Sequence, residues 1–238
     1  MLLAIAGCAS HDVATEAALQ DAKVGDAALT AGNPDVALRL ADDALTRNPN
    51  DTGALTRRGA ALTALGRLGE ARDSLRKAVR NQPGDVQAQL AFGRVELPVD
   101  PAAAATAFQA VLRQNGNDPV ALNDLGIAQD LQGQHAEAEA SYRGAIAAAP
   151  DMTAARVNLA LCLAIRGRGS EAIGLLRPLA DRPDAARKVR EDYAAVLAMA
   201  GERDEARRIL ASDMDAREIA PALDVLASAR TTAGNVTR

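Results

Sequence analysis

The sequence is poor in large aromatic side chains. Its 238 residues include no tryptophan, two phenylalanines and two tyrosines, although 48% of the chain is hydrophobic. A globular domain of this length usually anchors its core with more rings. Alanine and leucine, both strong helix formers, carry the hydrophobic share instead. Small inward-facing residues let helices pack in thin layers, so the composition favours an all-helical array over one thick core.

The sequence also lacks a basic excess, a long apolar run and a clustered set of metal ligands. The net charge is −4 and the pI is near 5.3, whereas a nucleic-acid-binding protein needs a basic face for phosphates. No run of 18 apolar residues is present, so no membrane-spanning helix is expected. Cys8 and Cys162 lie far apart, and neither has a histidine or cysteine at ligand spacing. We therefore expect no metal site and no cofactor.

An alanine recurs through most of the chain at a nearly constant spacing. Every step between these alanines is 34 residues except one of 33, which falls where Pro98 and Pro101 shorten a turn. The alanines are Ala37, Ala71, Ala104, Ala138, Ala172 and Ala206. If each repeat is counted from a start such as Thr52, they occupy position 20. A generic helical bundle would not keep its small residues in phase over six cycles.

Three other positions of the repeat have a physical reason. Position 8 is small, as expected where the first helix of a repeat crosses the second: Gly25, Gly59, Gly93, Gly126, Ala160 and Ala194. Position 15 is glycine, as expected where a left-handed residue closes the first helix: Gly32, Gly66, Gly133, Gly167 and Gly201. Prolines near position 32 end the second helix: Pro49, Pro83, Pro150 and Pro183.

This spacing is that of the tetratricopeptide repeat (TPR), which the chain resembles over most of its length. The resemblance implies an all-α fold, a right-handed solenoid of about six helix-turn-helix units with a C-terminal capping helix near residues 217–226. We expect the solenoid to span residues 11–230, followed by a frayed tail at 231–238. The expected repeats are 18–51, 52–85, 86–118, 119–152, 153–186 and 187–220.

The amino terminus carries a second resemblance. Ile5-Ala6-Gly7-Cys8 is similar to the lipobox of bacterial lipoproteins, which implies cleavage before Cys8 and acylation of its thiol. Ala9, rather than aspartate, implies sorting to the outer membrane. No positive residue precedes the motif and the apolar stretch is short, so residues 1–10 are interpreted as a truncated or vestigial signal. The alternative is a frayed apolar terminus with an incidental cysteine.

Residues capable of catalysis are few. His11 and His135 have no carboxylate or cysteine partner at a repeating offset, so both are expected to be solvated. Cys162 lies within the apolar run 157–165 and is expected to be a buried, inert thiol. Gly167-Arg168-Gly169-Ser170 lacks the Lys-Ser/Thr of a phosphate loop and falls at an inter-helix turn. The sequence therefore favours a protein-binding scaffold over an enzyme.

The carboxyl-terminal third of the sequence resembles one particular group of TPR proteins. The segments 158–164, 171–179 and 189–201, followed by Ala206, Ile209 and Met214, are similar to the TadD family, TPR lipoproteins of the Tad (Flp) pilus machinery. Asp192-Tyr193 departs from the Asn-Leu pair usual in that family. The resemblance implies a lipid-anchored protein on the periplasmic face of the outer membrane, which assists assembly or localisation of a secretin. Two alternatives stay open: a general periplasmic adaptor in envelope assembly or polysaccharide export, and a cytoplasmic adaptor or co-chaperone.

In TPR proteins the first helix of each repeat lines a concave groove, and we expect a partner peptide to bind there. In repeats four to six the groove positions include Asn123, Ile127, Asp130, Asn158, Leu161 and Lys188. Asn158 and Lys188 are similar to the pair that holds a terminal carboxylate in some TPR co-chaperones. Ile127 and Asp192 replace that clamp's Asn and Arg, so an extended, partly apolar segment is the expected ligand. Alternatively, Asn158 supports the fold through hydrogen bonds, and Lys188 is a solvated charge.

Overall fold

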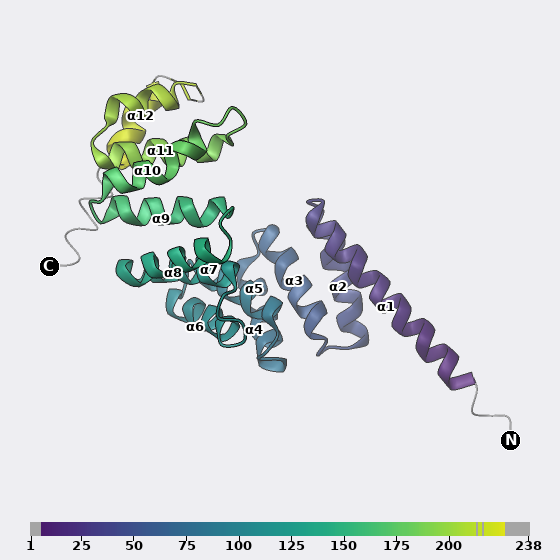
Figure 1. Ribbon diagram of the computed structural model, residues 1–238. Coiled ribbons are helices and arrows are strands. Elements are labelled where there is room, and N and C mark those ends of the chain that lie inside the picture. Colours follow the sequence, from purple (N-terminus) through teal and green to yellow (C-terminus); the bar gives the residue numbers. More distant parts are fainter. Residues whose placement is uncertain (1–5, 213, 216, 227–238) are drawn as a thin grey trace. The chain divides into compact units, whose positions relative to one another are not determined.

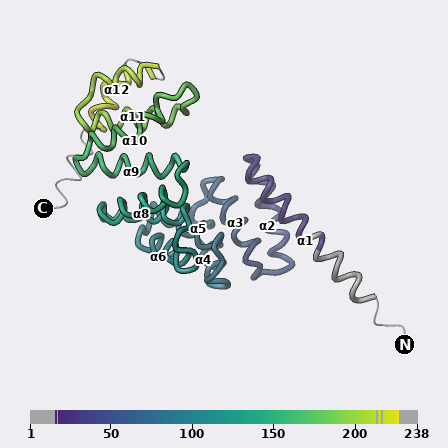
Figure 2. Tube along the Cα trace, in the orientation of Figure 1, coloured from purple at the N-terminus to yellow at the C-terminus, as the bar shows by residue number. Residues whose placement is uncertain are grey.

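The protein is built from helices that follow one another in antiparallel pairs (Figures 1 and 2). The computed structural model describes the backbone of residues 6–212, 214–215 and 217–226, and within these the side chains from Glu16 onward, Ala17 excepted. All regular elements in these ranges are helical. The chain forms two compact units, Met1–Val111 and Leu112–Arg238.

The first unit contains three helix pairs. They are α1 (Ala6–Thr30) with α2 (Pro34–Arg47), α3 (Thr52–Ala64) with α4 (Leu68–Asn81), and α5 (Val86–Glu96) with α6 (Pro101–Leu112). The short turn between α5 and α6 contains Pro98 and explains the single 33-residue step.

The second unit contains three further pairs and a final helix. The pairs are α7 (Pro119–Leu131) with α8 (His135–Ala148), α9 (Thr153–Ile165) with α10 (Gly169–Ala180), and α11 (Arg187–Ala200) with α12 (Arg203–Leu210). Residues 217–226 form the final helix, and its Ile219 and Leu223 are 3% and 0% exposed within the core of this unit. The predicted all-α array of six helix pairs and a capping helix is confirmed.

Aspartates start the first helix of several repeats. Asp51, Asp85 and Asp118 each accept a hydrogen bond from the backbone N–H three residues later, at 2.8 Å in every case. This contact satisfies one of the amide groups left free at a helix start. The residue before the first helix therefore has a fixed structural task in these repeats.

Glycines end the first helix of five repeats, as predicted. Gly32, Gly66, Gly133, Gly167 and Gly201 all have φ between 72° and 95°, a left-handed conformation that disfavours other residues. The N–H of the residue after each glycine donates to a carbonyl five residues back in the preceding helix. This is the hydrogen bond of a Schellman motif, which reverses the chain into the second helix.

The small residues of the repeat lie at the tightest helix contacts. All six position-20 alanines, from Ala37 to Ala206, are 0% exposed. Gly59, Gly93 and Gly126 face a bulky side chain of the second helix of their own repeat rather than the position-20 alanine, whereas Gly25 faces Arg57 of the next repeat. A Cβ added at Gly59 would lie 2.4 Å from Leu75, and one at Gly126 would lie 2.5 Å from the Tyr142 ring. Gly59 and Gly126 therefore provide space for a bulky side chain of the second helix of the same repeat.

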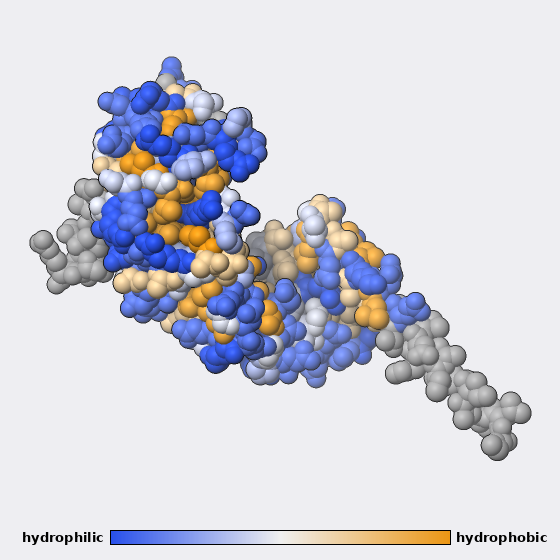
Figure 3. Space-filling view, viewed as in Figure 1, coloured by the Kyte–Doolittle hydropathy of each residue, from blue (hydrophilic) through white to orange (hydrophobic). Residues whose placement is uncertain are grey.

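Ion pairs connect neighbouring helix pairs within each unit. In the first unit, the buried Glu96 carboxylate accepts two hydrogen bonds from Arg72, at 3.1 and 2.8 Å. In the second, Glu139 accepts from Arg168 at 2.8 Å and also pairs with Arg143 and Arg166. Hydrophilic residues cover much of the surface that Figure 3 shows, with hydrophobic residues visible between them.

Candidate peptide-binding groove

The first helices of three consecutive repeats enclose a groove in the first unit. Its volume is about 530 Å³, and its lining comes from α1, α3 and α5. Repeats two and three contribute the residues at positions 2, 5, 6 and 9 of their first helix, which are the groove-facing positions in TPR proteins. A pocket of this size suits several residues of an extended peptide or one small ligand.

The floor of the groove is made of small residues and one arginine. Gly53 and Ala60 of α3 supply the small side chains. A Cβ added at Gly53 would lie 3.4 Å from the Arg57 guanidinium, and one at Gly25 would lie 3.4 Å from its Cδ. The Arg57 side chain thus lies beside both glycines along the floor, where it is 21% exposed.

The walls combine apolar and charged groups. Leu29 of α1 and Leu90 of α5 contribute apolar surface, and Asp26 places a carboxylate 4.0 Å from Arg57. At that separation the ion pair is loose, and the guanidinium keeps donors available for a ligand carbonyl or carboxylate. The groove can thus bury apolar side chains of a segment while Arg57 bonds its polar groups.

The residues predicted to bind in repeats four to six lie on α7, α9 and α11, in the second unit. Asn158 Nδ2 donates to Asn123 Oδ1 at 2.9 Å, and Asn123 Nδ2 donates to Asp124 Oδ1 at 3.1 Å. Asn123 is 5% exposed. These side chains link α7 to α9, and the partner of Asn158 is a side chain rather than the backbone, while its support of the fold stays a prediction.

The other predicted residues are partly engaged. Ile127 and Leu161 are half-buried against the core of the second unit. The Lys188 side chain is 75% exposed and forms an ion pair with Asp192 one turn later. The structure thus brings Asn123 and Asn158 together and leaves Lys188 on the surface. A binding role for this set stays a prediction.

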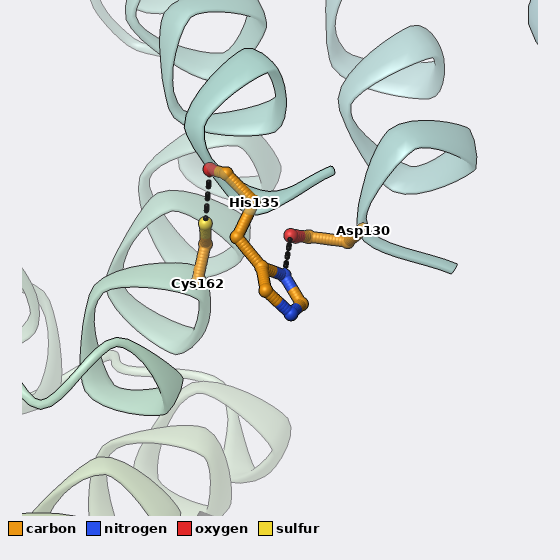
Figure 4. Close-up of side chains that lie close together, drawn as sticks. All are labelled: Asp130, His135 and Cys162. Carbon is orange, nitrogen blue, oxygen red and sulfur yellow. Dashed lines mark hydrogen bonds and ion pairs between the residues drawn. The ribbon is translucent and has the colours of Figure 1, made fainter. Parts of the chain in front are cut away.

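One expectation about chemistry is wrong: His135 has a carboxylate partner. Its Nδ1 lies 2.8 Å from Asp130 Oδ1, and its side chain is only 19% exposed (Figure 4). Gly133 reverses the chain between α7 and α8, which places the first residue of α8 beside the last turn of α7. Cys162 of the next repeat donates to the His135 backbone oxygen at 3.3 Å, so the expected absence of a histidine near this thiol is also wrong.

Cys162 is buried, as predicted, and its inertness stays a prediction. It is 0% exposed, and burial, reinforced by the Asp130 charge, raises its pKa to about 12. The nucleophilic form is the thiolate, which is scarce at neutral pH when the pKa is that high. The Nδ1 of His135 bonds the carboxylate and the thiol bonds a backbone oxygen, so the arrangement is not that of a cysteine activated by a base.

The predicted lipidation residue lies outside the described side chains. Cys8 falls within α1, but the side chains of residues 6–15 are not among those described, and the same holds for His11. Among the described residues, no helix is both long enough and apolar enough to cross a membrane.

Sequence reasoning missed the groove in the first unit, although the same positions in repeats two and three would have located it. Repeats four to six drew attention because their groove positions carry amides and a lysine. In repeats two and three the positions hold Gly53, Thr56, Ala60 and Ala91, which look ordinary individually. These small side chains leave room for a ligand between the helices, and that room can be seen only once α1, α3 and α5 are placed together.

The paired helices and the left-handed glycines define the class as a helical-repeat protein, and its groove suits interaction with a partner. Two tetratricopeptide-repeat models match the sequence, one at residues 24–86 and 100–153 and the other at 131–187. Together they cover more than half of the chain, which therefore belongs to the tetratricopeptide-repeat family. No curated protein matches the sequence.

Several solved structures share the fold. PilW, described as a widely conserved type IV pilus biogenesis factor, is 19% identical with a TM-score of 0.74, over 83% of this chain and 93% of PilW. A TPR protein of Parabacteroides merdae is 15% identical with a TM-score of 0.68, over 90% and 84% of the two chains. A thermophilic TPR protein of Thermus thermophilus is 22% identical with a TM-score of 0.64, over 76% and 98%. At these identities the likeness is one of fold.

Proposed function

We propose that this protein is a non-enzymatic scaffold that holds an extended segment of a partner protein in the groove of α1, α3 and α5. The observation that carries the proposal is the construction of this groove. Its floor is lined by Gly53 and Ala60, its walls by Leu29 and Leu90, and Arg57 lies along it. Proteins of the TPR family typically bind protein or peptide partners, and the burial of the Cys162 thiol favours a non-enzymatic role.

The biological setting we propose is assembly of a Tad (Flp) pilus. The resemblance of the carboxyl-terminal third to the TadD family supports it, and so does the shared fold with a type IV pilus biogenesis factor. In this setting the partner is an outer-membrane secretin, and acylated Cys8 anchors the protein to the periplasmic face of the outer membrane. A general periplasmic adaptor or a cytoplasmic co-chaperone is the alternative.

Blocking the groove tests the scaffold proposal. Ala60 is half-buried on the groove floor, so Ala60→Gln places a neutral side chain in the space of the ligand while keeping a good helix former. The matched control is Ala102→Gln on the exposed face of α6 in the same unit. Overlapping peptides covering the periplasmic part of a Tad-pilus secretin serve as ligands in fluorescence anisotropy.

We expect at least one peptide to bind the wild type and the Ala102→Gln variant equally, and Ala60→Gln at least tenfold more weakly. If all three proteins bind a peptide with equal affinity, the proposal that the peptide lies in the groove of α1, α3 and α5 is refuted. A loss in an Asn158→Ala, Lys188→Ala double variant that retains its helical signal would then move the ligand to α7, α9 and α11. No binding by any peptide would refute the secretin as partner.

A second experiment addresses the anchor. Cys8→Ser in the full-length gene product should abolish fatty-acid labelling and release the protein into the soluble periplasmic fraction, because stable anchoring needs the acyl chains. If the variant stays with the membrane as the wild type does, the lipoprotein proposal is wrong, and the scaffold proposal is unaffected.

A further inference from the structure

Three potential metal ligands from two repeats converge in the second unit. Asp130 lies near the end of α7, His135 begins α8 and Cys162 belongs to α9 (Figure 4). One carboxylate oxygen, one ring nitrogen and the thiol sulfur all lie within 4.8 Å of one another. The three side chains differ in chemistry and come from separate helices, so their convergence is not the repetition of one surface residue along a helix.

A fourth residue orients the carboxylate. The Tyr142 hydroxyl donates to Asp130 Oδ2 at 2.9 Å, which leaves Oδ1 directed at His135. Tyr142 is 2% exposed, and its ring fills the space above Gly126. Hydrogen bonding of a ligating carboxylate by a second residue is a regular feature of metal sites, where it fixes ligand orientation.

We propose that Asp130, His135 and Cys162 form a binding site for one zinc ion. A set of one sulfur, one nitrogen and one oxygen matches the borderline softness of Zn²⁺, which proteins bind through cysteine, histidine and aspartate at about 2.0–2.3 Å. These bond lengths in a tetrahedron separate the ligand atoms by roughly 3.4–3.6 Å. The 2.8 Å contact between Asp130 and His135 must therefore lengthen by side-chain rotation, and the separations from the sulfur, which are at most 4.8 Å, must adjust to the same range.

Two of the three side chains have access to solvent. The side chains of Asp130 and His135 are 20% and 19% exposed, whereas Cys162 is 0% exposed. An ion can therefore enter past the carboxylate and imidazole and reach the sulfur behind them. Water completes the tetrahedron, as in zinc sites with three protein ligands.

Charge and protons balance in the binding step. The thiol loses its proton to solvent when the Zn–S bond forms. The neutral imidazole keeps one proton, on the ring nitrogen that faces away from the metal, and Asp130 binds as a carboxylate. One proton is thus released for each ion, and the thiolate and carboxylate neutralise the 2+ charge.

A cobalt titration of the full chain tests the site. Co²⁺ replaces Zn²⁺ in such sites, and a cobalt–thiolate bond gives a charge-transfer band in the near ultraviolet. We expect the band to saturate at one ion per chain, to disappear when Zn²⁺ is added, and to be unchanged in Cys8→Ser. Cys162→Ser should abolish it, and Tyr142→Phe should weaken affinity by about 10–100-fold.

A thermal measurement gives an independent readout. Because an ion bound only to the folded state stabilises it, Zn²⁺ at about one hundred times its dissociation constant should raise the melting temperature by roughly 5–10 °C, reversibly with a chelator. Asp130→Asn, which keeps the side-chain shape, should remove this shift. Wild-type protein with neither band nor shift would overturn the proposal. A band that survives Cys162→Ser, or that Cys8→Ser removes, would overturn it as well by placing the ion elsewhere.

Discussion

Replacing Gly126 by alanine should destabilise the second unit. The added Cβ would lie 2.5 Å from Tyr142 Cε1, 2.7 Å from Cδ1 and 2.9 Å from Cζ. Ordinary contact requires about 3.5–4 Å, so the ring must move by roughly 1 Å. The ring cannot rotate away freely, because it is 2% exposed and its hydroxyl is bonded to Asp130.

The size of the effect follows from two opposing contributions. Overpacking a filled core costs about 1–3 kcal/mol, and the upper end applies here because a rigid ring, rather than the end of a flexible side chain, blocks the new methyl. Alanine gains about 1 kcal/mol over glycine in a helix interior. The net loss in the free energy of unfolding should be about 2 kcal/mol, which we would measure by urea denaturation followed by circular dichroism.

Gly174→Ala is the matched control. Gly174 lies on the exposed side of α10, and a Cβ there would meet no atom within 4 Å. Only the helix propensity remains, so this variant should be more stable than the wild type by up to about 1 kcal/mol. If both substitutions stabilise the protein equally, the close approach of Gly126 to Tyr142 is wrong, and the reason given for small residues at position 8 fails with it.

Three further changes test other parts of the structure. Ala71→Leu and Ala138→Leu should each cost about 1–3 kcal/mol in urea denaturation because both alanines are 0% exposed at helix crossings; near-zero losses at both would contradict the repeat phase. Asn158→Ala removes the donor to buried Asn123 Oδ1 and should cost about 1–3 kcal/mol; an unchanged denaturation midpoint would mean that the amide does not support the fold. In a Cys8→Ser background, Cys162 should resist a thiol reagent at pH 8 in the folded protein and react once unfolded, because burial raises its pKa to about 12; rapid reaction of the folded protein would refute the burial of this thiol.

The raised pKa of Cys162 makes the stability of the folded protein depend on pH. An unfolded cysteine has a pKa of about 8.5, so between that pH and about 12 the unfolded chain loses the proton while the folded protein keeps it. The contribution of protonated Cys162 to the free energy of unfolding is therefore fully present below the pKa of the unfolded chain, and it decreases as the pH rises toward 12.

Local steric rules made the fold predictable. A left-handed glycine, a buried alanine and a helix-ending proline are each selected by their own backbone or nearest neighbour. The phase of the repeat could therefore be assigned from residues such as Gly66, Ala71 and Pro83 without the tertiary structure. The small residues at position 8 were also predictable from the repeat spacing. The side chain that requires the small residue, such as Leu75 opposite Gly59, was not predictable from the sequence.

The sites were less predictable because they depend on contacts across repeats. Asp130 and His135 meet across a turn closed by Gly133, and Cys162 joins them from the following repeat. No single sequence spacing relates these three residues. The groove depends on small side chains in α3 and α5, which leave the space between the helices unfilled. Mapping the groove positions of all six repeats, rather than the last three, would have found it.

The helix contacts around the groove have a dynamic consequence. In repeat proteins each layer is stabilised by its neighbours, so a helix that packs on few others opens more readily than one that packs on many. Among the described helices, α1 contacts α2 and α3, and it also supplies Asp26 and Leu29 to the groove. A segment bound across α1, α3 and α5 therefore acts as an additional neighbour for the first layer. Its binding energy is used partly to suppress the opening of α1, and amide hydrogen exchange in that helix should slow in proportion to occupancy.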